Sequence, residues 1–260
     1  MILGVWQGAW DGGRVVSVAR DVHYTPREST QQVTLPCTST LRLNVQDEAL
    51  DYYQSSWTRH QSLAAAESQG ANTMIKVGIV LGSTRPGRNG EAVARWTLDV
   101  AKRRTDAEFE LVDLLDYNLP LLDEPMPPAM GNYTKEHTKV WSAKIDSLDG
   151  FVFVTAEYNH GIPAALKNAI DFLAREWNDK AAGFVSYGSS HGSRAVEHLR
   201  GVLAELQVAT VRAQLGLSLL TDFEQFRTFT PTAKHEAMLT PVLDQVVRWG
   251  GAMRSLRDAR

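Results

Sequence analysis

Cysteine is almost absent from this chain, because Cys37 is the single one among 260 residues. One cysteine excludes an intramolecular disulfide framework and a zinc site built from several cysteines. Such low cysteine use is typical of proteins in a reducing compartment. We therefore expect the protein in the cytoplasm.

A strong charge of either sign and a long apolar run are missing as well. The net charge is −3 and 22% of the residues are charged, so nothing indicates a nucleic-acid groove or a polybasic membrane patch. No apolar run approaches the roughly 18 residues of a transmembrane helix, and residues 1–10 lack the basic start of a secretory signal. We expect neither nucleic acid nor membrane as a partner, whereas a small ligand stays open.

Residues 1–73 contain neither lysine nor phenylalanine, and their short apolar patches follow no regular period. Such a segment buries too little apolar surface to offset its conformational entropy. A convincing strand begins directly after Met74. We therefore expect residues 1–73 to be a disordered N-terminal extension or to lie upstream of a natural start at Met74, and residues 74–260 to be the folded domain. A small regulatory extension is the alternative.

From residue 74 onward, apolar runs that predict strands alternate with stretches that predict helices. The predicted strands are Ile75–Leu81, Phe109–Leu115, Gly150–Thr155, Ala182–Tyr187 and Thr210–Leu217; the predicted helices are Gly90–Arg104, Glu136–Leu148, Pro163–Glu176, Arg194–Leu206 and Ala233–Leu256. Five such alternations favour an α/β domain whose parallel, doubly wound sheet carries helices on both faces. Sheets of this kind bind ligands at the carboxyl ends of their strands.

The loop after the first predicted strand reads GSTRPGRNG over residues 82–90. Its glycines permit a close approach of the backbone to a ligand. Ser83 and Thr84 offer hydroxyl groups, and Arg85 and Arg88 offer guanidinium groups that suit phosphate oxygens. The helix that follows points its free N–H groups toward the same place. The loop therefore predicts a site for one phosphate monoester.

Two other phosphate loops do not match this sequence. The spacing imitates the loop of nucleoside triphosphatases, but Arg88 replaces its lysine and Asn89 lacks the hydroxyl group that holds Mg²⁺. The dinucleotide fingerprint GxGxxG fails as well, because Thr84 occupies its second glycine position.

The loop after the third predicted strand carries the sequence AEYNHGI over residues 156–162, and Pro163 then opens a helix, a position that proline favours. Tyr158 supplies an aromatic face, and the Asn159 amide both donates and accepts hydrogen bonds. These are the partners that a flat heteroaromatic ring with uracil-like edges requires.

Together, GSTRPGRNG after a first strand and TAEYNHGIPAALKNAIDFL after a third resemble the NADPH-dependent FMN reductase family. The resemblance extends from Met74 to the last strand and does not include residues 1–73. It implies a flavodoxin-like fold, a doubly wound sheet of five parallel strands, with FMN held non-covalently. Ala156 stands where the family usually has proline, which removes some of the rigidity of this turn.

The resemblance also implies which residues bind FMN. Those expected at its phosphate are Ser83, Thr84, Arg85, Arg88, Asn89 and Gly90; those expected along the isoalloxazine ring are Glu157, Tyr158 and Asn159; and those expected at the flavin edge, after the fourth strand, are Ser186, Tyr187 and Gly188. We predict no metal site. His160 and His191 show no ligand spacing, and hydride transfer requires neither of them.

As the family does, we expect the chain to pass hydride from NADPH or NADH through FMN to a small electron acceptor. A quinone, free flavin, azo compound or metal oxyanion stays open as the acceptor. The cofactor carries the chemistry, so we name no catalytic residue. The family implies a homodimer, and a homotetramer stays open.

Two other functions share this fold. A flavodoxin-type electron carrier is disfavoured by the two arginines of the first loop and by the near-neutral charge, since flavodoxins are typically acidic. A flavin-binding regulatory protein with little turnover is the other. Fold alone does not decide among them.

Overall fold

The computed structural model describes residues 8–11, 14–17 and 74–259. The chain divides into two units, Met1–Ala71 and Asn72–Arg260. In the first unit, β1 (Gly8–Asp11) and β2 (Arg14–Ser17) form an antiparallel pair. Otherwise our prediction for residues 1–73 lies outside the described residues.

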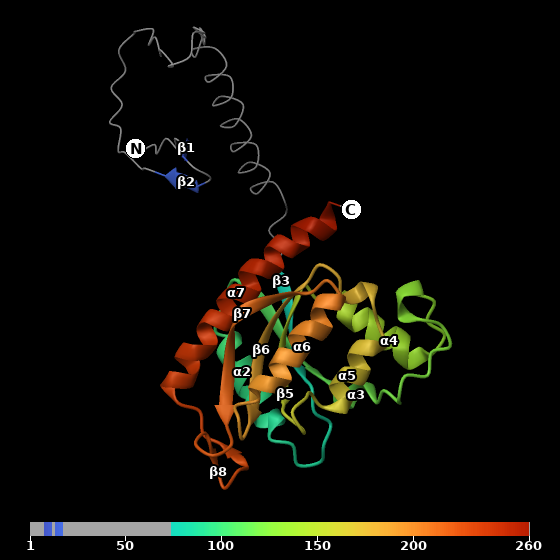
Figure 1. The fold of residues 1–260 in the computed structure, drawn as a ribbon. Helices are drawn as coiled ribbons and strands as arrows, with labels where there is room; N and C mark the ends of the chain where they lie inside the picture. The colour runs from blue at the N-terminus through green and yellow to red at the C-terminus, as the bar shows by residue number, and fades with distance from the viewer. Residues whose placement is uncertain (1–7, 12–13, 18–73, 260) are drawn as a thin grey trace, which may run out of the picture. The chain divides into compact units, whose positions relative to one another are not determined.

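The second unit is built on five parallel strands in the order β4-β3-β5-β6-β7 (Figure 1). Their bounds are β3 (Ile75–Leu81), β4 (Ala107–Asp113), β5 (Gly150–Ala156), β6 (Ala181–Gly188) and β7 (Ala209–Ser218). Every residue of the two strands β5 and β6 is buried, as continuous apolar runs in a covered parallel sheet require. The predicted doubly wound, flavodoxin-like sheet is confirmed.

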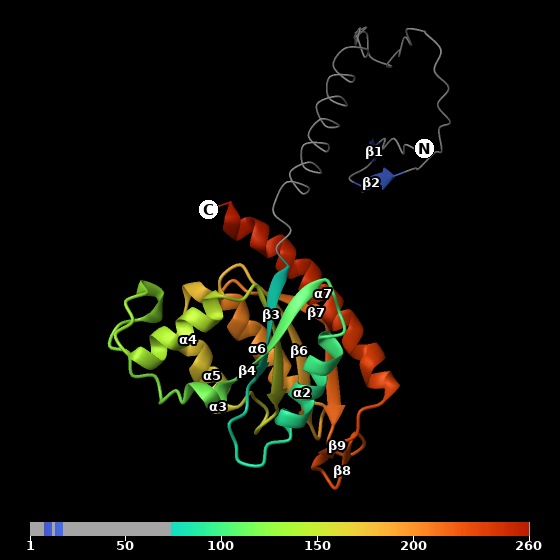
Figure 2. The same cartoon turned by 180° about the vertical axis from the view of Figure 1, so that it is seen from behind.

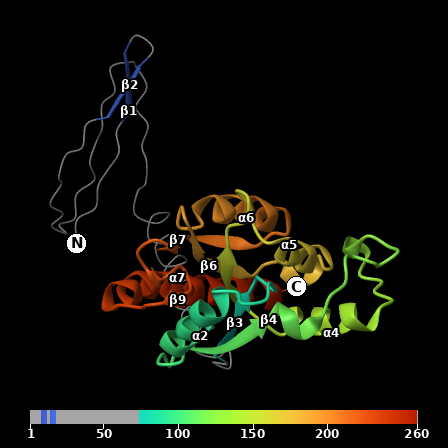
Figure 3. The ribbon, with the colours of Figure 1, turned by 90° about the horizontal axis from the view of Figure 1, so that it is seen from below.

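Helices cover both faces of this sheet. On one face α2 (Gly90–Ala101) and α7 (Ala233–Asp258) pack against the sheet, and on the other α4 (Glu136–Asp146), α5 (Ala164–Asp171) and α6 (Ser193–Glu205) do so. Figure 2 shows the face with α2 and α7, and Figure 3 shows the strands between the helical layers. No helix in the described part of the chain is long and apolar enough to cross a membrane.

Four short elements join this frame. They are α3 (Leu114–Tyr117), the 3-10 turns η1 (Pro128–Met130) and η2 (Arg175–Trp177), and the hairpin of β8 (Phe223–Glu224) and β9 (Thr228–Phe229). The predicted second strand, Phe109–Leu115, begins and ends two residues later than β4. The Asp113 carboxylate accepts a hydrogen bond from the Leu115 N–H (3.0 Å), and this cap starts α3.

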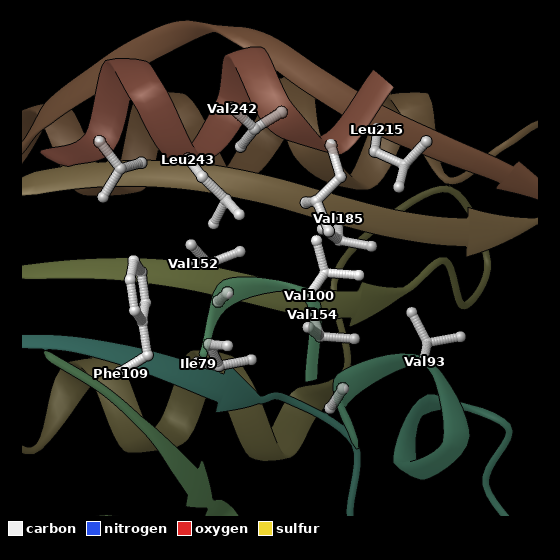
Figure 4. Packing of buried hydrophobic residues seen from close by; sticks show 14 of the residues in the cluster. Ile79, Val93, Val100, Phe109, Val152, Val154, Val185, Leu215, Val242 and Leu243 are labelled. Atoms are coloured by element: carbon white, nitrogen blue, oxygen red, sulfur yellow. The ribbon is translucent and has the colours of Figure 1, made fainter. Parts of the chain in front are cut away.

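The core between the sheet and helices α2 and α7 consists mainly of packed aliphatic side chains, with the aromatic ring of Phe109 among them (Figure 4). Gly183 of β6 faces α7. A Cβ atom there would lie 2.7 Å from a methyl group of Val242 and 2.7 Å from one of Val246. The close packing of α7 on the sheet therefore requires glycine at position 183.

The last turns of α7 are attached to the end of the sheet where the strands β3 and β5 begin. Asp149, directly before β5, forms ion pairs with Arg257 and, at 3.4 Å, with Arg254. The Asp149 carboxylate also accepts a hydrogen bond from the Lys76 N–H (2.9 Å). This ion-pair cluster fixes the C-terminal end of the helix.

Candidate functional site

The loops that the sequence analysis singled out follow β3, β5 and β6, three adjacent strands, and so meet at one edge of the sheet (Figure 1). Two backbone hydrogen bonds connect their starts. The Gly82 N–H donates to the Val154 carbonyl (3.0 Å), and the Glu157 N–H donates to the Tyr187 carbonyl (3.1 Å). The parallel sheet therefore brings the three loops together, as predicted.

Side chains join the first of these loops to the second. The hydroxyl groups of Ser83 and Tyr158 are hydrogen-bonded at 2.9 Å. The Arg85 guanidinium lies over the Tyr158 ring, 5.7 Å from the ring centroid. Arg85 is exposed, and no carboxylate of the described residues pairs with it. An exposed cation and two hydroxyl groups thus lie close together.

The start of α2 is open to a ligand. Asn89 occupies the N-cap position, but no side chain caps the helix, because the Asn89 amide instead donates to the Phe226 carbonyl at 2.7 Å. The Gly90 N–H interacts with the Tyr187 hydroxyl, but the Glu91 and Ala92 N–H groups have no acceptor among the described residues, and free N–H groups at a helix N-terminus favour an anion. Gly90 follows, where a Cβ atom would lie 2.6 Å from the Tyr187 hydroxyl.

Arg88 is held inside the protein. It forms an ion pair with Asp113, and its Nη1 donates to the Ser83 carbonyl at 2.6 Å. The side chain of Arg88 is 7% exposed and that of Asp113 is 14% exposed. Of the two arginines in this loop, only Arg88 has a carboxylate partner among the residues that the structure describes.

The loop after β5 contains a tight two-residue turn. The Tyr158 N–H donates to the Gly161 carbonyl (2.9 Å), and the Gly161 N–H donates to the Tyr158 carbonyl (3.1 Å). Asn159 and His160 between them have φ values of 48° and 75°, as a type I′ turn requires. Both are exposed, so the turn presents the Asn159 amide at its tip.

Glu157 connects the second loop to the third. Its carboxylate accepts hydrogen bonds from the Arg194 N–H (3.0 Å) and the Ala195 N–H (3.4 Å) at the start of α6, and it forms an ion pair with the Arg194 side chain. Burial acts to raise the pKa of Glu157, but these donors outweigh it and hold the pKa below its usual range. The side chain is 4% exposed, so it holds the loops together.

Replacing Glu157 with glutamine is expected to lower the unfolding free energy by about 1–2 kcal/mol at pH 7, since a charged cap becomes a neutral one. A depressed folded pKa stabilises the protein above the unfolded pKa of about 4.3, and this contribution is lost as the pH falls through the folded value. Urea unfolding at pH 7 and at pH 3 should therefore show the gap between variant and wild type narrowing. A gap that does not change with pH would contradict the role of the charge.

The loop after β6 is arranged by its own side chains. Ser186 is fully buried, and its hydroxyl group donates to the His191 carbonyl at 2.7 Å. Tyr187 is buried beneath Gly90. Of the three residues expected at the flavin edge, Ser186 and Tyr187 therefore point their side chains into the protein, and Gly188 offers only its backbone.

Two residues that contact the loop after β3 were not predicted from the sequence. Asp113 ends the neighbouring strand β4, and a signal for it existed, because an acid at the end of an adjacent parallel strand lies beside the first loop. Phe226, at the tip of the β8–β9 hairpin, gave no such signal, since 137 residues separate it from Asn89. Among the described residues, no group of three or more His, Cys, Asp or Glu side chains could hold a metal ion.

Comparison with known proteins finds relatives that are named as FMN reductases and quinone reductases. An NAD(P)H-dependent FMN reductase of Schizosaccharomyces pombe is 43% identical over 149 residues, which cover 56% of this chain and 74% of that protein. A quinone reductase of Escherichia coli is 32% identical over 140 residues, covering 51% and 71% respectively. Among solved structures, the flavoenzyme NAD(P)H:acceptor oxidoreductase FerB of Paracoccus denitrificans has the same fold, with a TM-score of 0.56 at 20% identity over 69% of this chain and 99% of that chain.

The sequence model described as NADPH-dependent FMN reductase matches residues 75–221, more than half of the chain. The match begins at the first residue of β3 and includes all three loops of the site. This chain therefore belongs to the NADPH-dependent FMN reductase family, the oxidoreductases that use FMN and NAD(P)H.

Proposed function

We propose that the edge of the sheet after β3, β5 and β6 binds FMN, with the phosphate on the first loop and the isoalloxazine ring along the turn at Tyr158 and Asn159. The observation that carries the proposal is that Arg85, which no described carboxylate pairs with, belongs to the loop that leads into the uncapped start of α2. Both attract an anion, and they lie in the same loop.

The residues fit a flavin phosphate by their donor chemistry. Ser83 contributes a hydroxyl group and Arg85 a charged donor, whereas the missing side chain of Gly90 makes room for the Tyr187 hydroxyl at the start of α2. Thr84, within the same loop, lines a small cavity of about 180 Å³ together with Asn118 and Asn168.

FMN bound here would supply the two-electron redox chemistry between NAD(P)H and an acceptor. The chain's own residues bind and orient. Glu157 holds the loop after β5 against α6, and the type I′ turn presents the Asn159 amide for the polar edge of a ring. Gly188 brings the third loop near that edge without a side chain. Such alignment supports catalysis without a protein acid or base.

For the acceptor we propose a quinone first, because the quinone reductase of Escherichia coli is among the similar proteins. The test is an anaerobic absorbance titration of the FMN-loaded full chain. Addition of NADPH or NADH should bleach the flavin, and a quinone should then restore its colour. A flavodoxin-type carrier would not be bleached without a partner reductase. Protein that takes up no FMN would refute the proposal.

We also propose that the chain acts as a homodimer or homotetramer in the cytoplasm. In support, the loop between α3 and α4 exposes large apolar side chains, with Leu121 83% exposed and Met130 48% exposed, and such patches mark contact surfaces. The single cysteine supports the location. Light scattering of the purified protein measures the mass, and a monomer would contradict the assembly.

A further inference from the structure

The loop after β3, residues 82–90, is called the phosphate loop below, and its two arginines are in different environments. Arg85 is exposed and unpaired among the described residues, whereas Arg88 is buried against Asp113. The Arg88 Nη1 atom lies 2.9 Å from Asp113 Oδ1 and 2.6 Å from the Ser83 carbonyl oxygen, and Nη2 contacts the other carboxylate oxygen. The guanidinium thus joins the end of β4 to the loop after β3.

The contact with the Ser83 carbonyl has a consequence for the next peptide N–H. In a planar trans peptide, the carbonyl oxygen and the following N–H point in opposite directions. Because Arg88 holds the Ser83 oxygen on its own side, the Thr84 N–H is turned to the opposite side. The structure gives this N–H no hydrogen-bond acceptor within residues 74–259.

We propose that Arg88 is a positioning residue for FMN: with Asp113 it fixes the Ser83–Thr84 peptide so that the Thr84 N–H binds the phosphate. This inference rests on the proposed binding site. Arg88 itself does not bind the phosphate. The positive charge at the phosphate comes from Arg85 and from the start of α2.

The charge balance favours this role over direct binding. A carboxylate beside a phosphate dianion is repulsive, so Asp113 would weaken a site in which Arg88 bound the phosphate. The bidentate geometry instead satisfies a guanidinium that is nearly excluded from water. Asp113 also caps α3 through the Leu115 N–H, which fixes the position of the carboxylate.

Asp113→Asn separates the two roles because they predict opposite signs. If Arg88 positions the loop, the weaker neutral partner loosens the peptide and FMN affinity falls about tenfold, the size of one charge-assisted hydrogen bond. If Arg88 binds the phosphate, removal of the negative charge increases FMN affinity. Asparagine keeps an oxygen that can cap α3, so the neighbouring helix is retained.

The measurement is the dissociation constant of FMN and of riboflavin for the full chain, by flavin fluorescence titration of protein freed of flavin. Positioning of a phosphate donor lowers the ratio of FMN to riboflavin affinity, whereas a purely structural defect lowers both affinities equally. Arg88→Lys is the second variant. It keeps the charge but loses the fork that reaches both Ser83 and Asp113, so it should lower the ratio as Asp113→Asn does.

A lower ratio in both variants supports the inference. A higher or unchanged ratio in Asp113→Asn overturns it, and so does an unchanged ratio in Arg88→Lys. The wild type separates this from the proposed function, because a wild-type chain that binds no FMN refutes the site itself. A wild type that binds FMN, with variants that do so equally well, refutes the positioning role alone.

Discussion

Replacing Asp149 with alanine is expected to lower the unfolding free energy by about 3 kcal/mol, the cost of breaking a largely buried ion pair. The Asp149 carboxylate is shared by Arg257, Arg254 and the Lys76 N–H. Its removal leaves the Lys76 N–H without this acceptor and Arg257 without its carboxylate. The end of α7 would then lose its attachment to the start of β5.

Urea unfolding of the full chain, followed by circular dichroism, measures this effect. Asp171→Ala is the matched control, because that aspartate pairs with Lys167 on the surface of α5 and is 40% exposed. Such an exposed pair contributes less than about 0.5 kcal/mol. Equal losses in the two variants would show that the Asp149 cluster has no special role. FMN affinity should not change, since Asp149 precedes β5 and the site follows it.

The strands were predictable because their physical signal is local. A parallel strand covered on both faces needs an unbroken apolar run, and the first predicted strand has the bounds of β3. The end of β4 was wrong for a local reason too. Leu114 and Leu115 continue the apolar run, so the pattern extends the strand through them. The Asp113 side chain instead accepts a hydrogen bond from the Leu115 N–H, and this cap ends the strand and starts α3.

The sequence predicted which residues lie in the loops of the site, but not which of them form ion pairs or hydrogen bonds with other parts of the chain. The sequence shows two arginines in one loop, and nothing local distinguishes Arg85 from Arg88. The difference arises because β4 lies beside β3, which brings Asp113 to within hydrogen-bonding distance of Arg88. Asn89 shows the same limit, because a residue type that prefers to cap its own helix donates to a distant hairpin instead. Residues distant in sequence therefore determine which hydrogen-bond donors of the loop remain available to a ligand.

The second large effect is expected from Arg85→Ala, which should weaken FMN binding about 30-fold, or about 2 kcal/mol, the contribution of hydrogen bonds to a charged group. Arg85 is the unpaired cation of the phosphate loop within the described residues. Riboflavin has no phosphate, so its affinity should not change. Fluorescence titration with both flavins measures the two constants.

Arg103→Ala is the control for lost charge, because Arg103 lies just beyond the opposite end of α2, is 60% exposed and pairs with Glu236. It should bind FMN as the wild type does. If Arg85→Ala weakens FMN and riboflavin equally, Arg85 acts on the ring through its position over Tyr158. If it weakens neither, the phosphate is not bound by this loop. Only the selective loss of FMN affinity agrees with one free arginine and an uncapped helix start as the phosphate site.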